Sequence, residues 1–188
     1  MEKIVKYLTA VAVFFCITSC SDDKEDHLEQ WMITNVNAFN AIKANPEYKE
    51  LKSLGNEGSI YYKVLKSGDG TDSIKYTSAV ACYYKGWLIA DYPNYNIKAG
   101  DVFDKRLLDD SPPASFYFYN PQTGGIINGW KTALQHMVKG DKWEIWIPYQ
   151  LGYGRIGSYD QNTGRVTIPG YSTLVFEIEV VSIKEIDD

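Results

Sequence analysis

Apolar and polar residues alternate most regularly near the end of the chain. Every second residue from Leu174 to Val180 is apolar, and Glu177 and Glu179 stand between them. A strand places successive side chains on opposite faces, so this pattern predicts a sheet strand with one buried and one wet face. The segment 142–147 alternates in the same way and predicts a second strand of this kind.

Three further apolar runs predict strands over 60–65, 75–89 and 116–119, because they are rich in Tyr, Val, Ile and Phe. Between the strands, four apolar residues fall at helical spacing and are flanked by glycines: Trp130, Ala133, Leu134 and Met137. This spacing predicts one helix of about three turns. The pattern therefore predicts an α+β fold, in which a sheet closes over one short helix.

The segment 28–58 predicts a helical N-terminal extension, with Trp31 and Phe39 on one side and a break at Asn45-Pro46. A shorter charged helical piece is expected over 47–54. Two interpretations stay open: a strap packed on its own domain, which we favour, or an arm that mediates dimerisation. Alternation places Trp146 on the outer face of its strand, so we expect Trp31 or Phe39 to cover it.

The first residues have the pattern of a targeting signal. Lys3 and Lys6 precede an apolar run, 8–17, that is too short to span a bilayer. The sequence ITSC ending at Cys20 resembles the lipobox of bacterial lipoproteins, in which the signal is cut just before a cysteine that receives acyl chains. We therefore expect a signal peptide over 1–19, with an ordinary cleaved signal and an incidental cysteine as the alternative.

A charged run follows Cys20 and predicts a solvated acidic tether over 20–27, because these residues have nothing apolar to bury. In some bacterial lineages such a stretch directs lipoproteins to the outer face of the outer membrane, and a simple spacer is an equal alternative. The expected location is the outer membrane, with the periplasmic and surface faces both open.

The net charge and the few Cys and His residues disfavour several classes of function. A net charge of -5 provides no basic surface to neutralise phosphates, which disfavours nucleic acid as a partner. Cys82 lies in an apolar run and is interpreted as a core residue rather than a nucleophile. His27 and His136 stand in the tether and on the polar side of the helix, so neither a metal site nor a Cys-His pair is expected. No cofactor is indicated.

Several motifs, in this order, resemble the FKBP-type peptidyl-prolyl isomerases: CYYKG at 82–86, VFD at 102–104, GWKTALQHMVKGDKWEIWIPYQLGYG at 129–154 and IPGYSTLVF at 168–176. The resemblance covers about 60–183. It implies a bent antiparallel sheet wrapped around the short helix, with a proline pocket between them, in a domain over 59–188.

The resemblance also implies the site. It gives catalytic roles to Tyr84, Phe103, Asp104 and Tyr153, and it completes the pocket with Phe116, Ile126, Ile127, Trp130, Ile168 and Phe176. The N–H of Ile127 and the hydroxyl of Tyr153 would donate to substrate carbonyls. Asp104 would lie at the rim as an acceptor or as a partner of Tyr84, with the capping of a local turn as the alternative.

Two segments depart from the pattern. The stretch 90–102 is longer than the connection usual before Phe-Asp, and we expect a flap beside the pocket. The loop 155–167 is also extended, so specificity is expected to differ there.

The implied function is peptidyl-prolyl cis-trans isomerisation that assists the folding of cell-envelope proteins. Its substrates would be proline-containing polypeptides, and macrolides are a second ligand class that the resemblance implies. The assembly would be a monomer or a dimer formed through the N-terminal extension. Two other functions stay open: a catalytically weak proline-binding or chaperone module, and a glycan-binding surface lipoprotein.

Overall fold

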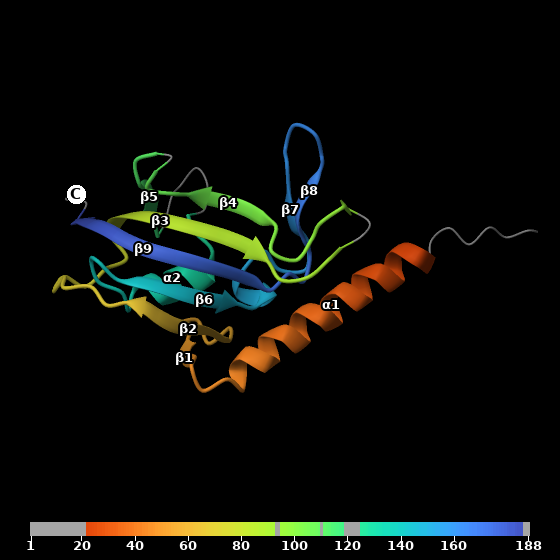
Figure 1. Cartoon of the computed structure of the whole chain (residues 1–188). Helices are drawn as coiled ribbons and strands as arrows, with labels where there is room; N and C mark the ends of the chain where they lie inside the picture. Colours follow the sequence, from red (N-terminus) through yellow and green to blue (C-terminus); the bar gives the residue numbers. More distant parts are fainter. Residues whose placement is uncertain (1–21, 93–94, 110, 119–124, 186–188) are drawn as a thin grey trace, which may run out of the picture.

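The computed structural model describes residues 22–92, 95–109, 111–118 and 125–185 (Figure 1). The expected signal peptide, Cys20 and Tyr119 lie outside these residues. Helices are α1 (Asp22–Lys43), α2 (Asn128–Leu134) and the short 3₁₀ helix η2 (Tyr149–Leu151). The strands are β1 Lys49–Lys52, β2 Ser59–Lys66, β3 Ser78–Leu88, β4 Val102–Arg106, β5 Ala114–Tyr117, β6 Lys142–Ile147, β7 Gly157–Tyr159, β8 Val166–Pro169 and β9 Leu174–Glu185.

One antiparallel sheet dominates the described residues, with strand order β1-β2-β6-β9-β3-β4. Strand β5 pairs with β3 beside β4, and β7 and β8 form a separate hairpin. Helix α2 lies against one face of the sheet (Figure 1). On β6 and β9, alternate side chains such as Ile145, Ile147 and Ile178 are fully buried on that face. The predicted α+β fold, a bent sheet around one short helix, is confirmed.

Helix α2 is shorter than the predicted three turns, because it has seven residues. The chain tightens after Leu134, where the N–H groups of His136 and Met137 donate to carbonyls three residues earlier. Met137 therefore reaches the core from a turn rather than from the helix. A Cβ atom at Gly129 would collide with Ile147, so this glycine lets α2 lie directly on β6.

The N-terminal extension differs from the predicted one at both ends. Helix α1 begins at Asp22, inside the segment expected to be a solvated tether, because a helix fixed by packing further along extends at little cost. The charged piece 47–54 is not helical, since Lys49–Lys52 pairs with β2 as the edge strand β1. The backbone of β2 offers hydrogen bonds there, and these override local propensity. In the described part of the chain, every helix is too short or too polar to cross a membrane.

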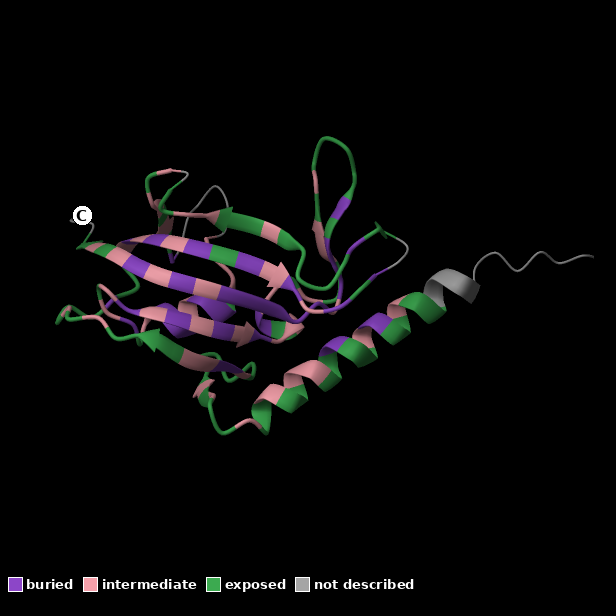
Figure 2. Cartoon of the chain, viewed as in Figure 1, coloured by how far each residue is buried: buried purple, intermediate pink, exposed green. Residues whose placement is uncertain are grey.

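Helix α1 packs on its own chain, as the strap interpretation predicted. Trp31 is buried, its Nε1 donates to the carbonyl of Gly170 at 3.0 Å, and its ring lies 5.1 Å from that of Tyr92. One turn later, Asn35 Oδ1 accepts the N–H of Thr173 at 2.8 Å. Figure 2 shows the buried residues of α1 in the middle of the helix, on the side that faces the sheet.

Trp146 faces outward from β6 as predicted, but the prediction that Trp31 or Phe39 covers it is wrong. Tyr48 packs edge-on against Trp146, with 6.4 Å between the ring centroids. Trp31 instead contacts Tyr92, and Phe39 contacts Tyr61. The ring that contacts Trp146 therefore comes from the segment after α1.

We predict that Trp31→Ala lowers the free energy of unfolding by about 3 kcal/mol, because it removes a buried ring and a buried hydrogen bond. Ile33→Ala, on the exposed side of the same helix, should cost less than about 1 kcal/mol. Urea denaturation followed by circular dichroism measures both. Equal effects of the two substitutions would show that α1 does not belong to the cooperative unit.

Candidate functional site

A cavity of about 190 Å³ opens where α2 meets strands β3, β4, β5 and β9. Every residue predicted for the proline pocket lines it except Phe103 and Ile168. Its lining residues are Tyr84, Asp104, Phe116, Gly125, Ile126, Ile127, Trp130, Tyr153 and Phe176. The fold therefore gathers side chains from segments far apart in sequence into one aromatic pocket.

Trp130 forms the floor of this cavity. It is the third residue of α2 and is 4% exposed. Three other aromatic rings contact it, those of Tyr84 at 5.3 Å, Phe116 at 5.0 Å and Phe176 at 5.2 Å between centroids. Tyr84 and Phe176 meet the indole edge-on, an arrangement that aromatic quadrupoles favour. The result is a rigid apolar floor.

Gly86, in the motif CYYKG, explains how the rings fit over β3. A Cβ atom there would collide with the ring of Phe176 and would lie 2.8 Å from Cζ of Phe103. The two rings meet edge-on at 5.3 Å, so Phe103 lies beside Phe176. Phe103 thus supports the cavity wall through Phe176 and lines a neighbouring cavity instead.

Ile168 also lies outside the lining of this cavity. It is on β8, 4% exposed and part of the hydrophobic core. The hairpin of β7 and β8 turns this side chain inward, because alternate residues of a strand face opposite sides. Phe103 and Ile168 therefore do not line this cavity in the structure, and their contact with the substrate stays a prediction.

The polar groups of the cavity lie on β3, β4 and the segment after η2. The hydroxyl of Tyr84 donates to Asp104 Oδ2 at 2.9 Å, so the structure favours Asp104 as a partner of Tyr84. Burial, and then Asp104, raise the pKa of Tyr84 well above its ordinary value. Burial and Asp104 also raise the pKa of Tyr153. Both hydroxyls therefore remain protonated donors at neutral pH.

Ile127 stands at the start of α2, where its extended backbone (φ −60°, ψ 150°) precedes the first helical turn. Its carbonyl accepts the N–H groups of Trp130 and Lys131. Its own N–H remains the predicted donor to a substrate carbonyl.

Three residues that shape the cavity or its charge were not among the predicted site residues. Gly125 lines the cavity at a backbone φ of 84°, and Gly86 makes room for the two Phe rings. Arg106 is opposite Tyr84 in the β3–β4 ladder, and its positive charge acts to lower the pKa of Tyr84. The two-residue spacing from Asp104 could have placed Arg106 on the same face of the strand.

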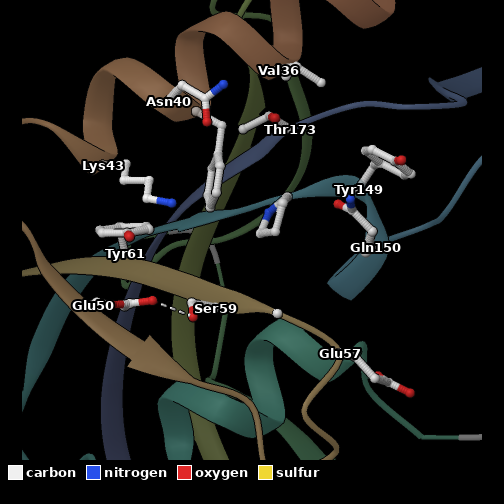
Figure 3. Close-up of a pocket in the computed structure, with 13 residues that line it drawn as sticks. Val36, Asn40, Lys43, Glu50, Glu57, Ser59, Tyr61, Tyr149, Gln150 and Thr173 are labelled. Atoms are coloured by element: carbon white, nitrogen blue, oxygen red, sulfur yellow. Dashed lines mark hydrogen bonds between the residues drawn. The ribbon is translucent and has the colours of Figure 1, made fainter.

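A larger cavity, of about 330 Å³, lies between α1, β1, β2 and η2 (Figure 3). Figure 3 shows Lys43 beside Tyr61, and Ser59 hydrogen-bonded to Glu50. None of the predicted site residues lines this cavity. The aromatic pocket over Trp130 is therefore the candidate site.

Cys82 is fully buried in β3, and burial raises the pKa of its thiol to about 12. It is therefore protonated at neutral pH and unsuited to nucleophilic attack. The described part of the chain contains no group of three or more His, Cys, Asp or Glu side chains placed to hold a metal ion.

Comparison with known families identifies a match over more than half of the chain. The model described as FKBP-type peptidyl-prolyl cis-trans isomerase matches residues 70–181. The FKBP-type 22 kDa peptidyl-prolyl cis-trans isomerase of Escherichia coli is 35% identical over 127 residues, which are 68% of this chain and 51% of the relative. The macrophage infectivity potentiator of Trypanosoma cruzi is 29% identical over 98% of this chain and 84% of the relative.

The peptidyl-prolyl cis-trans isomerase Mip of Coxiella burnetii is 32% identical over 77% of this chain and 52% of the relative. The chain thus spans about half the length of the Escherichia coli and Coxiella proteins. A crystal structure of a peptidyl-prolyl cis-trans isomerase from Pseudomonas syringae has a TM-score of 0.61 and 28% identity, and the match covers 84% of this chain and 96% of that one. FkpA from Escherichia coli has a TM-score of 0.62 and 26% identity, over 87% of this chain and 64% of that one.

We predict a specific alkaline destabilisation from Tyr84. Its pKa is raised in the folded state, so its contribution is complete below the unfolded pKa near 10 and is lost as pH rises above that value. Tyr84→Phe should therefore show a shallower fall in the free energy of unfolding from pH 9.5 to 11.5 than the unmodified chain. Urea denaturation across this pH series measures the slope.

Phe116→Leu is the control, because it weakens packing on Trp130 without removing an ionisable group. It should lower stability equally at every pH. If Tyr84→Phe leaves the alkaline slope unchanged, the Tyr84 hydroxyl is not buried against Asp104 in solution.

Proposed function

This chain belongs to the FKBP-type peptidyl-prolyl cis-trans isomerase family, and we propose that it catalyses cis–trans isomerisation of X-Pro bonds in other polypeptides. The observation that carries the proposal is the aromatic cavity floored by Trp130, with Tyr84, Phe116 and Phe176 around it. A proline ring is a compact apolar group that suits such a pocket. Proline-containing polypeptides are the proposed substrates.

The chemistry requires rotation about a peptide bond and no bond cleavage. Amide resonance sets a barrier of about 18–20 kcal/mol, and it places negative charge on the carbonyl oxygen of the planar form. Water stabilises that charge, so transfer into an apolar cavity favours the less polar twisted amide. Trp130 and Phe176 supply this environment, because both are 4% exposed and line the cavity.

The polar groups at the rim hold the substrate in position. Tyr153 is 38% exposed, and its hydroxyl is protonated. This hydroxyl is therefore within reach of a bound peptide. The bond from Tyr84 orients Asp104 and leaves its second carboxylate oxygen as an acceptor. The family's macrolide ligands are proposed to occupy the same cavity.

The chain is proposed to act at the cell envelope as a lipoprotein anchored through Cys20. Support comes from the lysines, the apolar run and the ITSC sequence that precede α1. Helix α1 begins at Asp22, and Leu28 is the first of its described side chains that packs against the core, so about 9 Å of helix lies between the start of α1 and the domain. Its substrates would then be envelope proteins that fold beside the outer membrane.

We predict that the chain accelerates isomerisation of a short Ala-Leu-Pro-Phe peptide, and that Tyr153→Phe lowers kcat/KM about fivefold to tenfold. The loss corresponds to about 1 kcal/mol for one hydrogen bond to the substrate. NMR exchange spectroscopy measures the rate without a coupled protease. No acceleration by the folded chain would leave a proline-binding or chaperone module as the function.

Tyr117→Phe is the matched control, since Tyr117 is 41% exposed, lies on β5 and does not line the cavity. It should retain full kcat/KM. Trp130→Leu should lower kcat/KM at least about tenfold, because it removes the floor that all three other rings contact. A Trp130→Leu variant that stays folded and fully active would contradict the placement of the site.

We predict that expression in a bacterium with lipoprotein processing gives a chain that partitions into the detergent phase of Triton X-114. Cys20→Ser should move it to the aqueous phase, because a buried methylene contributes about 0.8 kcal/mol and the acyl chains attach there. Cys82→Ser is the control and should stay in the detergent phase, since that thiol is buried. A wild-type chain found in the aqueous phase would overturn the anchor.

A further inference from the structure

The cavity of about 330 Å³ between α1, β1, β2 and η2, which we call the α1 cavity, is larger than the aromatic pocket over Trp130. The two cavities share no lining residue. The volume of the α1 cavity is within the range of small-molecule sites, about 300–1,000 Å³. Isomerisation uses none of its side chains, so the α1 cavity is available for a separate ligand.

Aromatic rings form part of its walls. Phe39 of α1 meets Tyr61 of β2 edge-on, with 5.5 Å between the ring centroids. Figure 3 shows Tyr149 of η2 on the opposite side of the cavity from Tyr61. Phe39 and Tyr149 are only partly buried, so these two rings give the α1 cavity apolar surface that a ligand can contact.

The ring of Tyr149 is held in position by a strained neighbour. Tyr171 packs against it at 5.1 Å between centroids and has a backbone φ of 61°, a left-handed conformation that tyrosine rarely adopts. The N–H of Tyr171 donates to Gly154 O at 2.9 Å, and the N–H of Gly154 donates to Tyr149 O at 2.8 Å. Such strain persists where the surrounding structure imposes it, often at ligand sites. Tyr149 is therefore fixed before a ligand binds.

Two carboxylates on the lining are oriented by hydrogen bonds. The hydroxyl of Ser59 donates to Glu50 Oε1 at 2.7 Å, as Figure 3 shows. Asn128 Nδ2 donates to Glu57 Oε2 at 2.9 Å. A carboxylate accepts through both of its oxygens, so Glu50 and Glu57 each keep a second oxygen as an acceptor for a ligand.

Hydrogen-bond donors lie on the same lining. Lys43 reaches from α1 toward Tyr61, opposite Glu50 (Figure 3), and it forms no ion pair within the described residues. The exposed amides of Asn40 and Gln150 each supply both a donor and an acceptor. Donors and acceptors are therefore interspersed around the aromatic surface.

This combination favours an uncharged ligand that is rich in hydroxyl groups. One ammonium group and two carboxylates leave no large excess of either charge, so strongly anionic or cationic ligands are disfavoured. A hydroxyl group both donates and accepts, so it can bond to Lys43 and to Glu50 alike. A sugar ring also has an apolar face of C–H groups, which the negative face of an aromatic ring attracts.

An extended peptide suits the α1 cavity less well. Such a peptide binds by pairing with a free strand edge. In β2, Ser59 is opposite Lys52 and Tyr61 is opposite Glu50, both on β1. Tyr61 is also opposite Trp146 on β6, so β2 has a strand on each side where it lines the cavity. The backbone there offers no free edge to a peptide.

We propose that the α1 cavity is a carbohydrate-binding site that takes a sugar ring of a neutral oligosaccharide. Phe39 and Tyr149 contact the apolar face of the ring, and Lys43, Glu50 and Gln150 bind its hydroxyl groups. The site is independent of the proposed isomerase function. It allows the chain to hold a glycan while the aromatic pocket acts on a polypeptide.

The test is an NMR titration of the folded chain with maltotriose, cellotriose and N,N′-diacetylchitobiose. At least one of these sugars should shift the amide signals of residues 39–43, 57–59 and 148–150 in a saturable manner, because these segments line the cavity. No saturable shift with any of them would overturn the proposal. Shifts centred on Trp130 would also overturn it, since the sugar would then occupy the aromatic pocket.

The peptide Ala-Leu-Pro-Phe separates the two ligand classes in the same experiment. It should shift the signals of the aromatic pocket and leave those of the α1 cavity unchanged. Saturable shifts of the α1 cavity by the peptide, with none by the sugars, would assign the cavity to polypeptides and overturn the proposal.

Substitutions then locate the sugar. Asn40→Ala and Gln150→Ala should each raise the Kd of the bound sugar about fivefold, because each removes a hydrogen bond at an exposed position where the fold tolerates the change. Tyr149→Ala should raise the Kd at least about tenfold, because it removes an aromatic contact surface. Gln150→Ala should leave kcat/KM for the Ala-Leu-Pro-Phe peptide unchanged.

Asn37→Ala is the matched control for Asn40→Ala. Asn37 is also an exposed asparagine of α1, but it does not line the cavity. Its substitution should leave the Kd unchanged. The proposal is overturned if Asn37→Ala and Asn40→Ala have equal effects, or if neither Asn40→Ala nor Gln150→Ala weakens binding.

Discussion

The packing of Trp130 beneath the sheet is the contact on which the site depends. Its indole is held by Tyr84 from β3, Phe116 from β5 and Phe176 from β9, so one side chain fixes the relative positions of three strands and α2. Gly129 makes this possible, because any side chain there would push α2 away from Ile147. The stability of the fold and the shape of the cavity therefore depend on the same contacts. Weaker packing of Trp130 would lower the first and change the second.

Helix α1 extends this rigidity to the outer segments. Trp31 contacts Tyr92 in the segment 90–102, and it donates to Gly170 at the end of the hairpin that contains β8. One buried side chain thus contacts two segments that lie far apart in sequence. The strap therefore does more than cover apolar surface, since it also ties these two segments to α1.

Sequence patterns predicted the elements in which one face of a strand or helix is continuously apolar. The alternation of β6 and β9 and the spacing of Trp130, Ala133 and Leu134 are of this kind. Strand β1 was missed because its stability comes from pairing with β2, and a charged edge strand has no apolar pattern of its own. The family motifs brought together the residues of the aromatic cavity, but they could not separate lining from support. Phe103 and Asp104 are neighbours in sequence, yet they line different cavities, a distinction that depends on the hairpin packed beside them.

The distribution of charge in the cavity explains why rotation, rather than bond cleavage, is the chemistry that it suits. Asp104 is the one carboxylate among its lining residues, it lies at the exposed rim, and the hydroxyl of Tyr84 occupies one of its oxygens. At the floor, Trp130 and Phe176 present no ionisable group. A twisted amide has lost resonance charge separation, so it gains from a floor without charges, whereas a hydrolytic intermediate would require donors at that same place. The protonated hydroxyls of Tyr84 and Tyr153 lie to the side, where they can fix the peptide while leaving the centre of the cavity apolar.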